Sequence, residues 1–215
     1  MKLSSGLGLA FCLCLAVNAQ AALTDPVIWS SLDGGNNHLY ELTPTRDTWT
    51  AQEAYAVAIG GHLVSINSQA EQNFLISTFL VGSTSTVPLW IGLTDQPNHD
   101  SESYTTWTTS EAVTFRNFNP NEPNNSASDE DYVAMNWHYS FGSSNTMGTW
   151  NDLPNGGSTV SYNDTNARAL GPYYGVIEIV PEPGTVWLLA VAGLFLVCWK
   201  TRRAAQVQLV KQMGC

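Results

Sequence analysis

Three short polar stretches between positions 122 and 152 constrain this chain more than any other feature. They are Glu122-Pro123-Asn124, Ser128-Asp129-Glu130-Asp131 and Trp150-Asn151-Asp152. Together they gather carboxylate and amide oxygens, and no Lys lies near them to neutralise the charge. Ca²⁺ is a hard cation that takes roughly 6–8 oxygen ligands of these kinds. The spacing therefore indicates a loop and a later strand that share one cation site, against the simpler alternative of a solvated acidic turn.

The N-terminus has the pattern of a secretory signal peptide. Lys2 precedes an apolar stretch from Leu7 to Val17, and Ala19-Gln20-Ala21 offers a cleavage site of small residues. The apolar stretch is too short to span a membrane comfortably, which argues against the alternative of an N-terminal anchor. We therefore expect residues 1–21 to be removed and the exported domain to begin at residue 22.

The C-terminus has three parts in a fixed order. Pro181-Glu182-Pro183 opposes both helix and strand, which indicates an extended linker. The apolar run at 186–199 follows, shorter than the roughly 20 residues of a straight membrane span. A basic cluster at 200–203 comes next, and by the positive-inside rule it predicts a cytoplasmic tail at 204–215.

This order resembles the PEP-CTERM sorting signal of Gram-negative bacteria over residues 181–203. The resemblance implies recognition of Pro181, Glu182 and Pro183 by an exosortase, after the short transmembrane helix has held the precursor in the membrane. It also implies transfer of the exported part to the cell surface or extracellular matrix. An ordinary single-pass anchor is the alternative, and the tail that runs on to Cys215 departs from the usual signal.

Charge and cysteine content narrow the possible functions. Residues 22–180 contain seventeen Asp and Glu but only three Arg and no Lys, so the surface repels phosphate backbones and nucleic-acid binding is excluded. The four cysteines lie at positions 12, 14, 198 and 215. The expected domain is therefore free of disulfides, which a domain of this size tolerates.

The sequence gives no support for an enzyme. The four histidines, at 38, 62, 99 and 138, are scattered and form no His-Glu-x-x-His motif, and no Gly-x-Ser-x-Gly elbow is present. Neighbouring carboxylates such as Asp129, Glu130 and Asp131 rarely reach the separation of about 5 Å or more that a glycosidase pair needs. We therefore expect a binding protein.

Periodicity and capping residues predict an ordered set of elements. Residues 25–42 indicate two short strands around a Gly- and Asn-rich turn. A helix is expected from Thr48 to Gly60, with Ala54, Ala58 and Ile59 at helical spacing. The other expectations are a strand at 62–66, a helix after Ser68 that buries Phe74, Leu75, Phe79 and Leu80, strands at 89–93, 131–135 and 174–179, and a surface insertion at 154–172.

The order of these motifs resembles the C-type lectin-like domain over residues 22–180. A helix, Gly-Gly-x-Leu-x-x-Ile at 60–66, a second helix and Trp-Ile-Gly-Leu at 90–93 come before Glu-Pro-Asn and Trp-Asn-Asp. The resemblance implies an α+β fold in which two helices flank two small antiparallel sheets, with a long calcium- and sugar-binding loop. Trp90, Gly92 and Trp150 are the expected structural residues of that framework.

By the same resemblance, five side chains bind both calcium and carbohydrate, and Pro123 follows a cis peptide bond. The five are Glu122, Asn124, Glu130, Asn151 and Asp152. The Glu-Pro-Asn order implies a mannose-like glycan with vicinal equatorial hydroxyls. The expected function is thus a calcium-dependent lectin module at a bacterial surface. The alternative is a non-sugar adhesive or structural scaffold in which calcium only stiffens the loop.

Two further expectations concern positions around this framework. Ala56 and Ile177 stand where the family has a disulfide, and we expect apolar packing between them to take over part of its role. The aromatic residues at 137–139 are candidates for a sugar-stacking face, with a core or rim position as the alternative.

Overall fold

The structure, a computed structural model, describes residues 25–96, 103–126, 129–160 and 166–181. The expected signal peptide at 1–21, the apolar run at 186–199 and the tail at 204–215 lie outside the described residues, as do Glu182 and Pro183. Within the described ranges no helix is long and apolar enough to cross a membrane.

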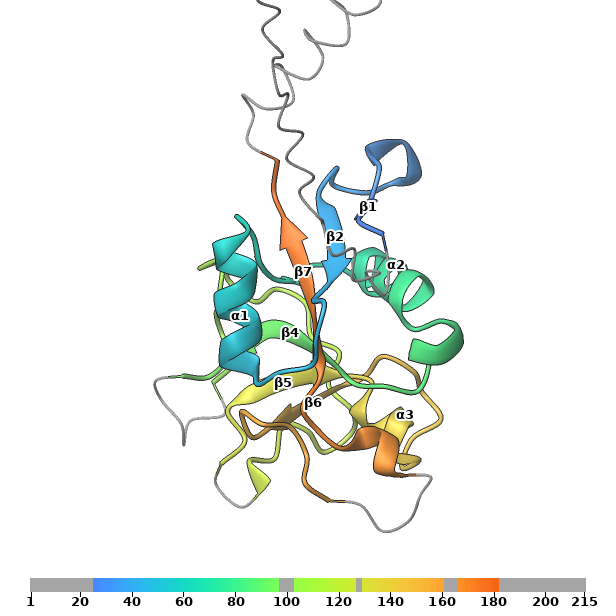
Figure 1. Ribbon diagram of the computed structural model, residues 1–215, viewed down its shortest axis with the longest axis vertical. Coiled ribbons are helices and arrows are strands. Elements are labelled where there is room, and N and C mark those ends of the chain that lie inside the picture. Colours follow the sequence, from blue (N-terminus) through green and yellow to red (C-terminus); the bar gives the residue numbers. More distant parts are fainter. Residues whose placement is uncertain (1–24, 97–102, 127–128, 161–165, 182–215) are drawn as a thin grey trace, which may run out of the picture.

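The described chain forms short strands and three α-helices (Figure 1). The first part contains β1 (Val27–Ile28), β2 (Leu39–Leu42), α1 (Trp49–Ala58), β3 (His62–Leu63), α2 (Gln69–Phe79) and β4 (Leu89–Thr94). The second part contains β5 (Tyr132–Met135), α3 (Trp137–Phe141), β6 (Trp150–Leu153) and β7 (Tyr174–Ile179). Short 3₁₀ turns lie at Ser31–Asp33, Gly82–Thr84 and Asn166–Ala169.

Strand β7 joins the two halves of the sheet. It pairs antiparallel with β2 and β3 at its outer half, and parallel with β4 at residues 174–175. Strands β4, β5 and β6 then follow as antiparallel neighbours. Helices α1 and α2 lie on opposite sides of β7 (Figure 1). The predicted α+β fold with two flanking helices is confirmed, with its two antiparallel parts linked through the parallel β4–β7 contact.

Helix α1 begins where the sequence predicts but buries a different face. The Thr48 side chain accepts a hydrogen bond from the Ala51 N–H, as an N-cap should. Trp49, Gln52 and Ala56 form the buried face. The helix is present as predicted, and the apolar residues Ala54, Ala58 and Ile59, which the sequence places at helical spacing, are exposed. The physical reason is the Trp49 indole, whose Nε1 donates to the Ile91 carbonyl at 2.8 Å and turns this side of the helix inward.

Helix α2 follows its sequence signals closely. The Ser68 hydroxyl accepts from the Glu71 N–H at 3.1 Å, and Glu71 Oε2 accepts from the Asn67 N–H at 2.8 Å. These bonds satisfy N–H groups that the first turn leaves without helical partners. Leu75, Phe79 and Leu80 are buried as predicted, and Phe74 is partly buried against the same core.

Strand β4 is the buried centre of the sheet, and the structure shows the surroundings of Gly92, Trp90 and Trp150, whose structural role stays a prediction. A Cβ on Gly92 would collide with the Leu63 carbonyl oxygen, so any side chain here would force the backbone to move. Trp90 is fully buried and its Nε1 donates to the Asp47 carbonyl at 3.0 Å. Trp150 is also fully buried, and its Nε1 donates to Gln72 Oε1 at 2.8 Å.

Two further predictions concern the packing of Ala56 against Ile177 and the stretch 154–172. Ala56 and Ile177 are both fully buried where α1 contacts β7, and their direct packing stays a prediction. The stretch 154–172 is not simply a surface insertion, because part of it is tied to the core. The Tyr173 hydroxyl donates to the Ala169 carbonyl at 2.6 Å and accepts from the Ser158 N–H at 2.8 Å.

Candidate functional site

The long loop enters the site through backbone pairing with β6. The Trp150 N–H donates to the Asn117 carbonyl at 2.8 Å, and the Asn119 N–H donates to the Trp150 carbonyl at 2.9 Å. Phe118 thus pairs with Trp150 as an isolated parallel bridge. Because this bridge precedes Glu122 by only four residues, it brings Glu-Pro-Asn beside the Trp-Asn-Asp strand.

Glu122 and Asn124 face each other across Pro123. The Glu122–Pro123 peptide bond is cis, as the family resemblance implies. The Asn124 side-chain amide donates to Glu122 Oε2, so the two predicted ligands are in direct contact. The Glu122 N–H donates to the Asn119 carbonyl at 3.0 Å, which closes the turn before the proline.

Asp152 lies on β6 and anchors the loop to that strand. Its carboxylate is fully buried and accepts from the Asn124 N–H at 3.1–3.2 Å and from the Asn125 N–H at 2.7 Å. Burial, and secondarily the nearby Glu122 carboxylate, raises the pKa of Asp152 to about 6, although these backbone hydrogen bonds oppose the rise. A cation beside Asp152 would relieve the cost of burying its charge.

Glu130 closes the loop from its far end. Its Oε2 accepts from the Ser126 N–H at 2.8 Å, and its own N–H donates to Asn125 Oδ1 at 3.2 Å. Asn125 therefore connects Glu130 to Asp152 through its side chain and its backbone. This role of Asn125 was not predicted from the sequence. Asn125 has a positive φ of 45°, and three other asparagines have values of 63–74°. Such values are typical of tight turns, and their positions could not be predicted from the sequence.

His138 is the second residue that sequence reasoning did not assign to the site. Its Nε2 lies 2.9 Å from Glu122 Oε1 and 3.1 Å from Asn151 Oδ1. The ring therefore joins the fifth predicted ligand, Asn151, to the loop. The ring of its neighbour Trp137 stacks on Phe141 at a centroid separation of 4.8 Å, and a sugar-stacking role for residues 137–139 stays a prediction.

All five predicted residues thus belong to one connected hydrogen-bond network. The donor set is three carboxylates and two amides, which is oxygen chemistry suited to Ca²⁺. Over the ranges that the structure describes, no three His, Cys, Asp or Glu side chains gather closely enough to hold a metal without help. Any cation here would therefore depend on the amide oxygens of Asn124 and Asn151.

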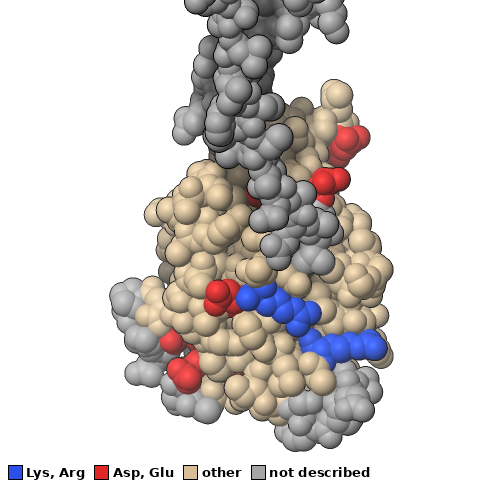
Figure 2. Space-filling model, viewed as in Figure 1, with Lys and Arg blue, Asp and Glu red and all other residues tan. Residues whose placement is uncertain are grey.

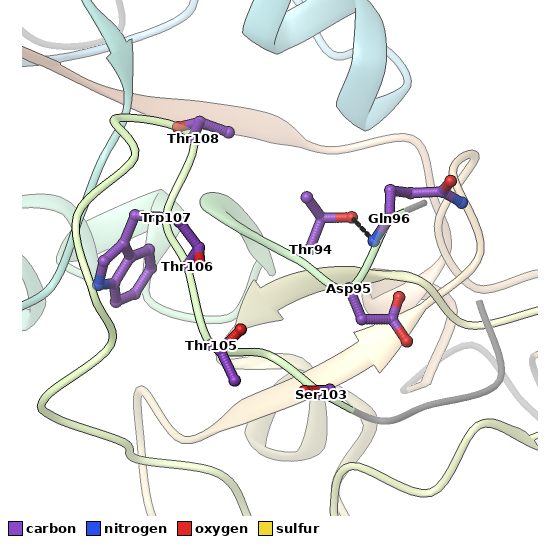
Figure 3. Close-up of a pocket in the computed structure, with 8 residues that line it drawn as sticks. All are labelled: Thr94, Asp95, Gln96, Ser103, Thr105, Thr106, Trp107 and Thr108. Carbon is purple, nitrogen blue, oxygen red and sulfur yellow. Dashed lines mark hydrogen bonds between the residues drawn. The ribbon is translucent and has the colours of Figure 1, made fainter. Parts of the chain in front are cut away.

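A separate hollow of about 410 Å³ opens between the end of β4 and the chain at 103–108 (Figure 3). Thr94, Asp95, Gln96, Ser103, Thr105, Thr106, Trp107 and Thr108 line it. Its wall reaches the acidic loop, because the Gln96 side-chain amide donates to Asp131 Oδ2 at 2.6 Å. None of the five predicted ligands lines this hollow.

Charged side chains are sparse on the face shown in Figure 2, which consists mostly of uncharged residues. The excess of acidic residues in the domain is therefore not distributed evenly over its surface. Part of it is internal, since Asp152, Asp131 and Glu71 are all buried.

Comparison with known proteins agrees with this geometry. Residues 45–159 match the Lectin C-type domain, and residues 180–203 match the PEP-CTERM protein-sorting motif. The versican core protein of Rattus norvegicus is 34% identical over 128 residues, which are 59% of this chain and 4% of versican. Human C-type lectin domain family 17, member A is 33% identical over 131 residues, 61% of this chain and 29% of that protein. The chain thus spans only a small part of these relatives.

Solved structures show the same fold. The C-type lectin CEL-I from Cucumaria echinata superposes with a TM-score of 0.53 at 22% identity, covering 69% of this chain and 94% of CEL-I. Human lithostathine gives 0.51 at 20% identity, covering 68% and 95%. Because the C-type lectin match spans more than half of the sequence, the chain belongs to the C-type lectin domain family, whose members are binding proteins rather than enzymes.

Proposed function

We propose that the chain is a calcium-dependent carbohydrate-binding protein with a mannose-type site. The observation that carries the proposal is one hydrogen-bond network, in which Asn124 bonds directly to both Glu122 and Asp152. The other two proposed ligands are connected to it through one residue each, Glu130 through Asn125 and Asn151 through His138. The proposed ligands come from two parts of the sequence, 122–130 and 151–152, and all of them offer side-chain oxygens. Such a set suits a hard divalent cation.

The proposed ligands are Glu122, Asn124, Glu130, Asn151 and Asp152. Bound Ca²⁺ would supply a positive charge with open coordination positions for two neighbouring sugar hydroxyls. Each hydroxyl can then accept from the amide of Asn124 or Asn151 and donate to the carboxylate of Glu122 or Glu130. Two donors and two acceptors at fixed positions select hydroxyl pairs by geometry, and we assign a mannose-like pair from the Glu-Pro-Asn order.

A single site of this kind binds weakly. Sugars bury little apolar area, and an affinity on the order of millimolar corresponds to about 4 kcal/mol. Useful binding then requires many copies on one surface, since avidity rises with the effective concentration of linked sites. The sorting motif at the C-terminus supports such an arrangement.

We further propose that residues 1–21 direct export, 22–180 form the binding domain, 181–203 are read by an exosortase, and 204–215 are a cytoplasmic tail. The precursor would be held in the membrane by 186–199 and then transferred to the surface or matrix of a Gram-negative cell. Mass spectrometry of the mature protein tests this directly. A C-terminus near Pro181 supports sorting, and an intact C-terminus at Cys215 contradicts it.

A scaffold that binds no sugar is the second candidate. Its support is that His138 contacts two of the proposed ligands, and that the same fold occurs in the herring type II antifreeze protein, with a TM-score of 0.50 at 18% identity. In this case calcium would only order the loop.

One experiment separates the two candidates. The purified full-length chain is titrated with calcium by calorimetry and then applied to a glycan array with calcium and with EDTA. Calcium-dependent binding to mannose-type glycans supports the lectin. Calcium binding that raises the melting temperature, without glycan binding, supports the scaffold. An absence of calcium binding contradicts both.

A further inference from the structure

His138 reaches the site from α3 and sits between two of the proposed ligands. Its Nε2 is 2.9 Å from Glu122 Oε1 and 3.1 Å from Asn151 Oδ1. Both atoms are oxygens that can only accept, so Nε2 must carry the hydrogen and donate it to the pair. On the other side of the ring, Nδ1 lies 2.8 Å from the Ser143 hydroxyl. Both ring nitrogens therefore have partners, which fixes the orientation of the imidazole.

The helix that carries His138 is itself held firmly. Asn136, at its start, is fully buried, and its side-chain amide donates to the Val87 carbonyl at 3.1 Å. Its Oδ1 accepts from the Gly148 N–H at 3.0 Å. Trp137 stacks on Phe141 within the same turn, and the His138 side chain is only 12% exposed. The imidazole is thus supported by packing and hydrogen bonds, which is the condition for a preorganised site.

Donation by His138 leaves both oxygens able to bind a cation. A carboxylate or amide oxygen has two lone pairs, so one can accept from the imidazole while the other faces the ion. Without such a donor, the side chains of Glu122 and Asn151 could adopt more rotamers. Binding an ion would then cost the conformational entropy of fixing them. Outer groups that orient metal ligands in this way typically change metal affinity by roughly 10–100-fold when removed.

We propose that His138 is a positioning residue that holds Glu122 Oε1 and Asn151 Oδ1 in place for the cation. The proposal rests on the function proposed above, since it concerns the same five ligands. It adds that α3, and not only the loop and β6, sets the affinity of the site. The His138 imidazole acts as a hydrogen-bond donor and does not bind the ion.

The test is calcium calorimetry on the full-length wild type and on three variants. His138→Leu removes the donor, and we expect calcium binding to weaken by roughly 10–100-fold. His138→Gln can return an N–H close to the position of Nε2, and we expect binding within a few-fold of wild type. His62→Leu is the matched control, because it removes a different histidine–carboxylate contact, to Glu53 at 2.6 Å, far along the chain from the site.

Each result supports or overturns the proposal. Wild-type affinity in His138→Leu overturns it. So does an equal loss in His138→Gln and His138→Leu when both melt like wild type in EDTA, because the donor is then not the cause. If His138→Leu fails to fold, His138→Asn replaces it, since its shorter amide cannot reach Glu122. Absence of calcium binding by the wild type refutes the proposed function itself, a different outcome.

Discussion

Asp152 Oδ2 accepts a hydrogen bond of 2.7 Å from the backbone N–H of Asn125, although 27 positions separate the two residues. The same carboxylate accepts from the next N–H along the loop, that of Asn124. These two hydrogen bonds fasten the loop to strand β6. A proposed calcium ligand therefore also ties the loop to the sheet, in addition to the backbone bridge between Phe118 and Trp150.

Asp152→Ala should consequently weaken the fold as well as the site. Two backbone N–H groups lose their acceptor, and an unsatisfied buried donor costs about 1–3 kcal/mol. We expect that loss in the free energy of unfolding, measured by urea denaturation in EDTA at about pH 4, where the Asp152 carboxyl is protonated in the folded state and no cost of burying its charge is removed with it. Asp129→Ala, an exposed carboxylate in the same loop, is the control and should change stability by less than about 0.5 kcal/mol. Equal changes in the free energy of unfolding for the two variants would show that the hydrogen bonds of Asp152 do not stabilise the fold.

Asn151→Ala should remove calcium binding and glycan binding together. The described carboxylates form no metal cluster without amide help, so loss of this amide leaves too few ligands. Calorimetry with calcium and a glycan array with the same sample measure both losses. Calcium affinity equal to wild type would exclude Asn151 from the site.

A paired exchange addresses sugar preference without removing ligands. Glu122→Gln with Asn124→Asp keeps four side-chain oxygens and nitrogens at the same places but reverses which side donates. We expect preference to shift from mannose-type to galactose-type glycans, measured on an array in calcium. Preference unchanged while calcium still binds would place the sugar contact elsewhere.

Local signals explain how much of the fold could be predicted. Thr48 and Ser68 cap the two helices as expected, because capping depends only on residues three positions away. Gly92 was expected at a close backbone approach, and the Leu63 carbonyl is the group that approaches. The loop and strand carrying the proposed ligands were also expected to meet, and the bridge between Phe118 and Trp150 brings them together.

Long-range contacts explain what was missed. Nothing near His138 in the sequence indicates that its ring reaches Glu122, sixteen positions earlier. The buried face of α1 depended on Trp49 finding the Ile91 carbonyl, a contact across 42 positions. Likewise, Ser158 and Ala169 look like parts of an exposed insertion until Tyr173 is placed between them. In each case one polar atom finds a partner that periodicity does not reveal.

Gly92→Ala tests the close approach inside the sheet. The added Cβ would meet the Leu63 carbonyl oxygen and lie 2.7 Å from Thr108 Oγ1, so backbone must move. Overpacking of this kind costs about 1–3 kcal/mol, which thermal or urea unfolding would detect. Gly156→Ala is the matched control, because its Cβ would meet nothing within 4 Å. A stable Gly92→Ala protein would mean that β3 and β4 are not held this closely.

Glu71 lies buried beside a second carboxylate, that of Glu178. Glu71 Oε1 accepts from the Tyr40 hydroxyl at 2.6 Å, and Glu178 Oε1 lies 3.1 Å from the same hydroxyl. His38 Nδ1 contacts Glu178 at 2.6 Å, and Asn36 donates to the Tyr40 oxygen at 2.7 Å. Burial raises the pKa of Glu71, with Glu178 adding to the rise and the Asn67 N–H, Tyr40 and His38 opposing it.

The sign of the resulting pH dependence follows from proton binding. A raised pKa means that the folded state holds its proton more tightly than the unfolded state, in which Glu71 has its ordinary pKa of 4.5. Glu71 therefore disfavours folding progressively as the pH rises through that value, until the carboxyl is ionised in the folded state too. Burial also raises the pKa of Tyr40, so its hydroxyl stays a donor throughout this range.

Glu71→Gln removes this titration while keeping a carbonyl for the Asn67 N–H. We measure the melting temperatures of the variant and the wild type in EDTA. We expect the variant's value minus the wild-type value to increase as the pH rises from about 4 to about 8. The groups that face Glu71, including His38 and Glu178, are common to both proteins, so their titration largely cancels in the difference. Asp33→Asn, at an exposed position, controls for the loss of one charge and should show no such trend. A difference that stays flat or reverses with pH would mean that ionised Glu71 is fully compensated by its hydrogen bonds.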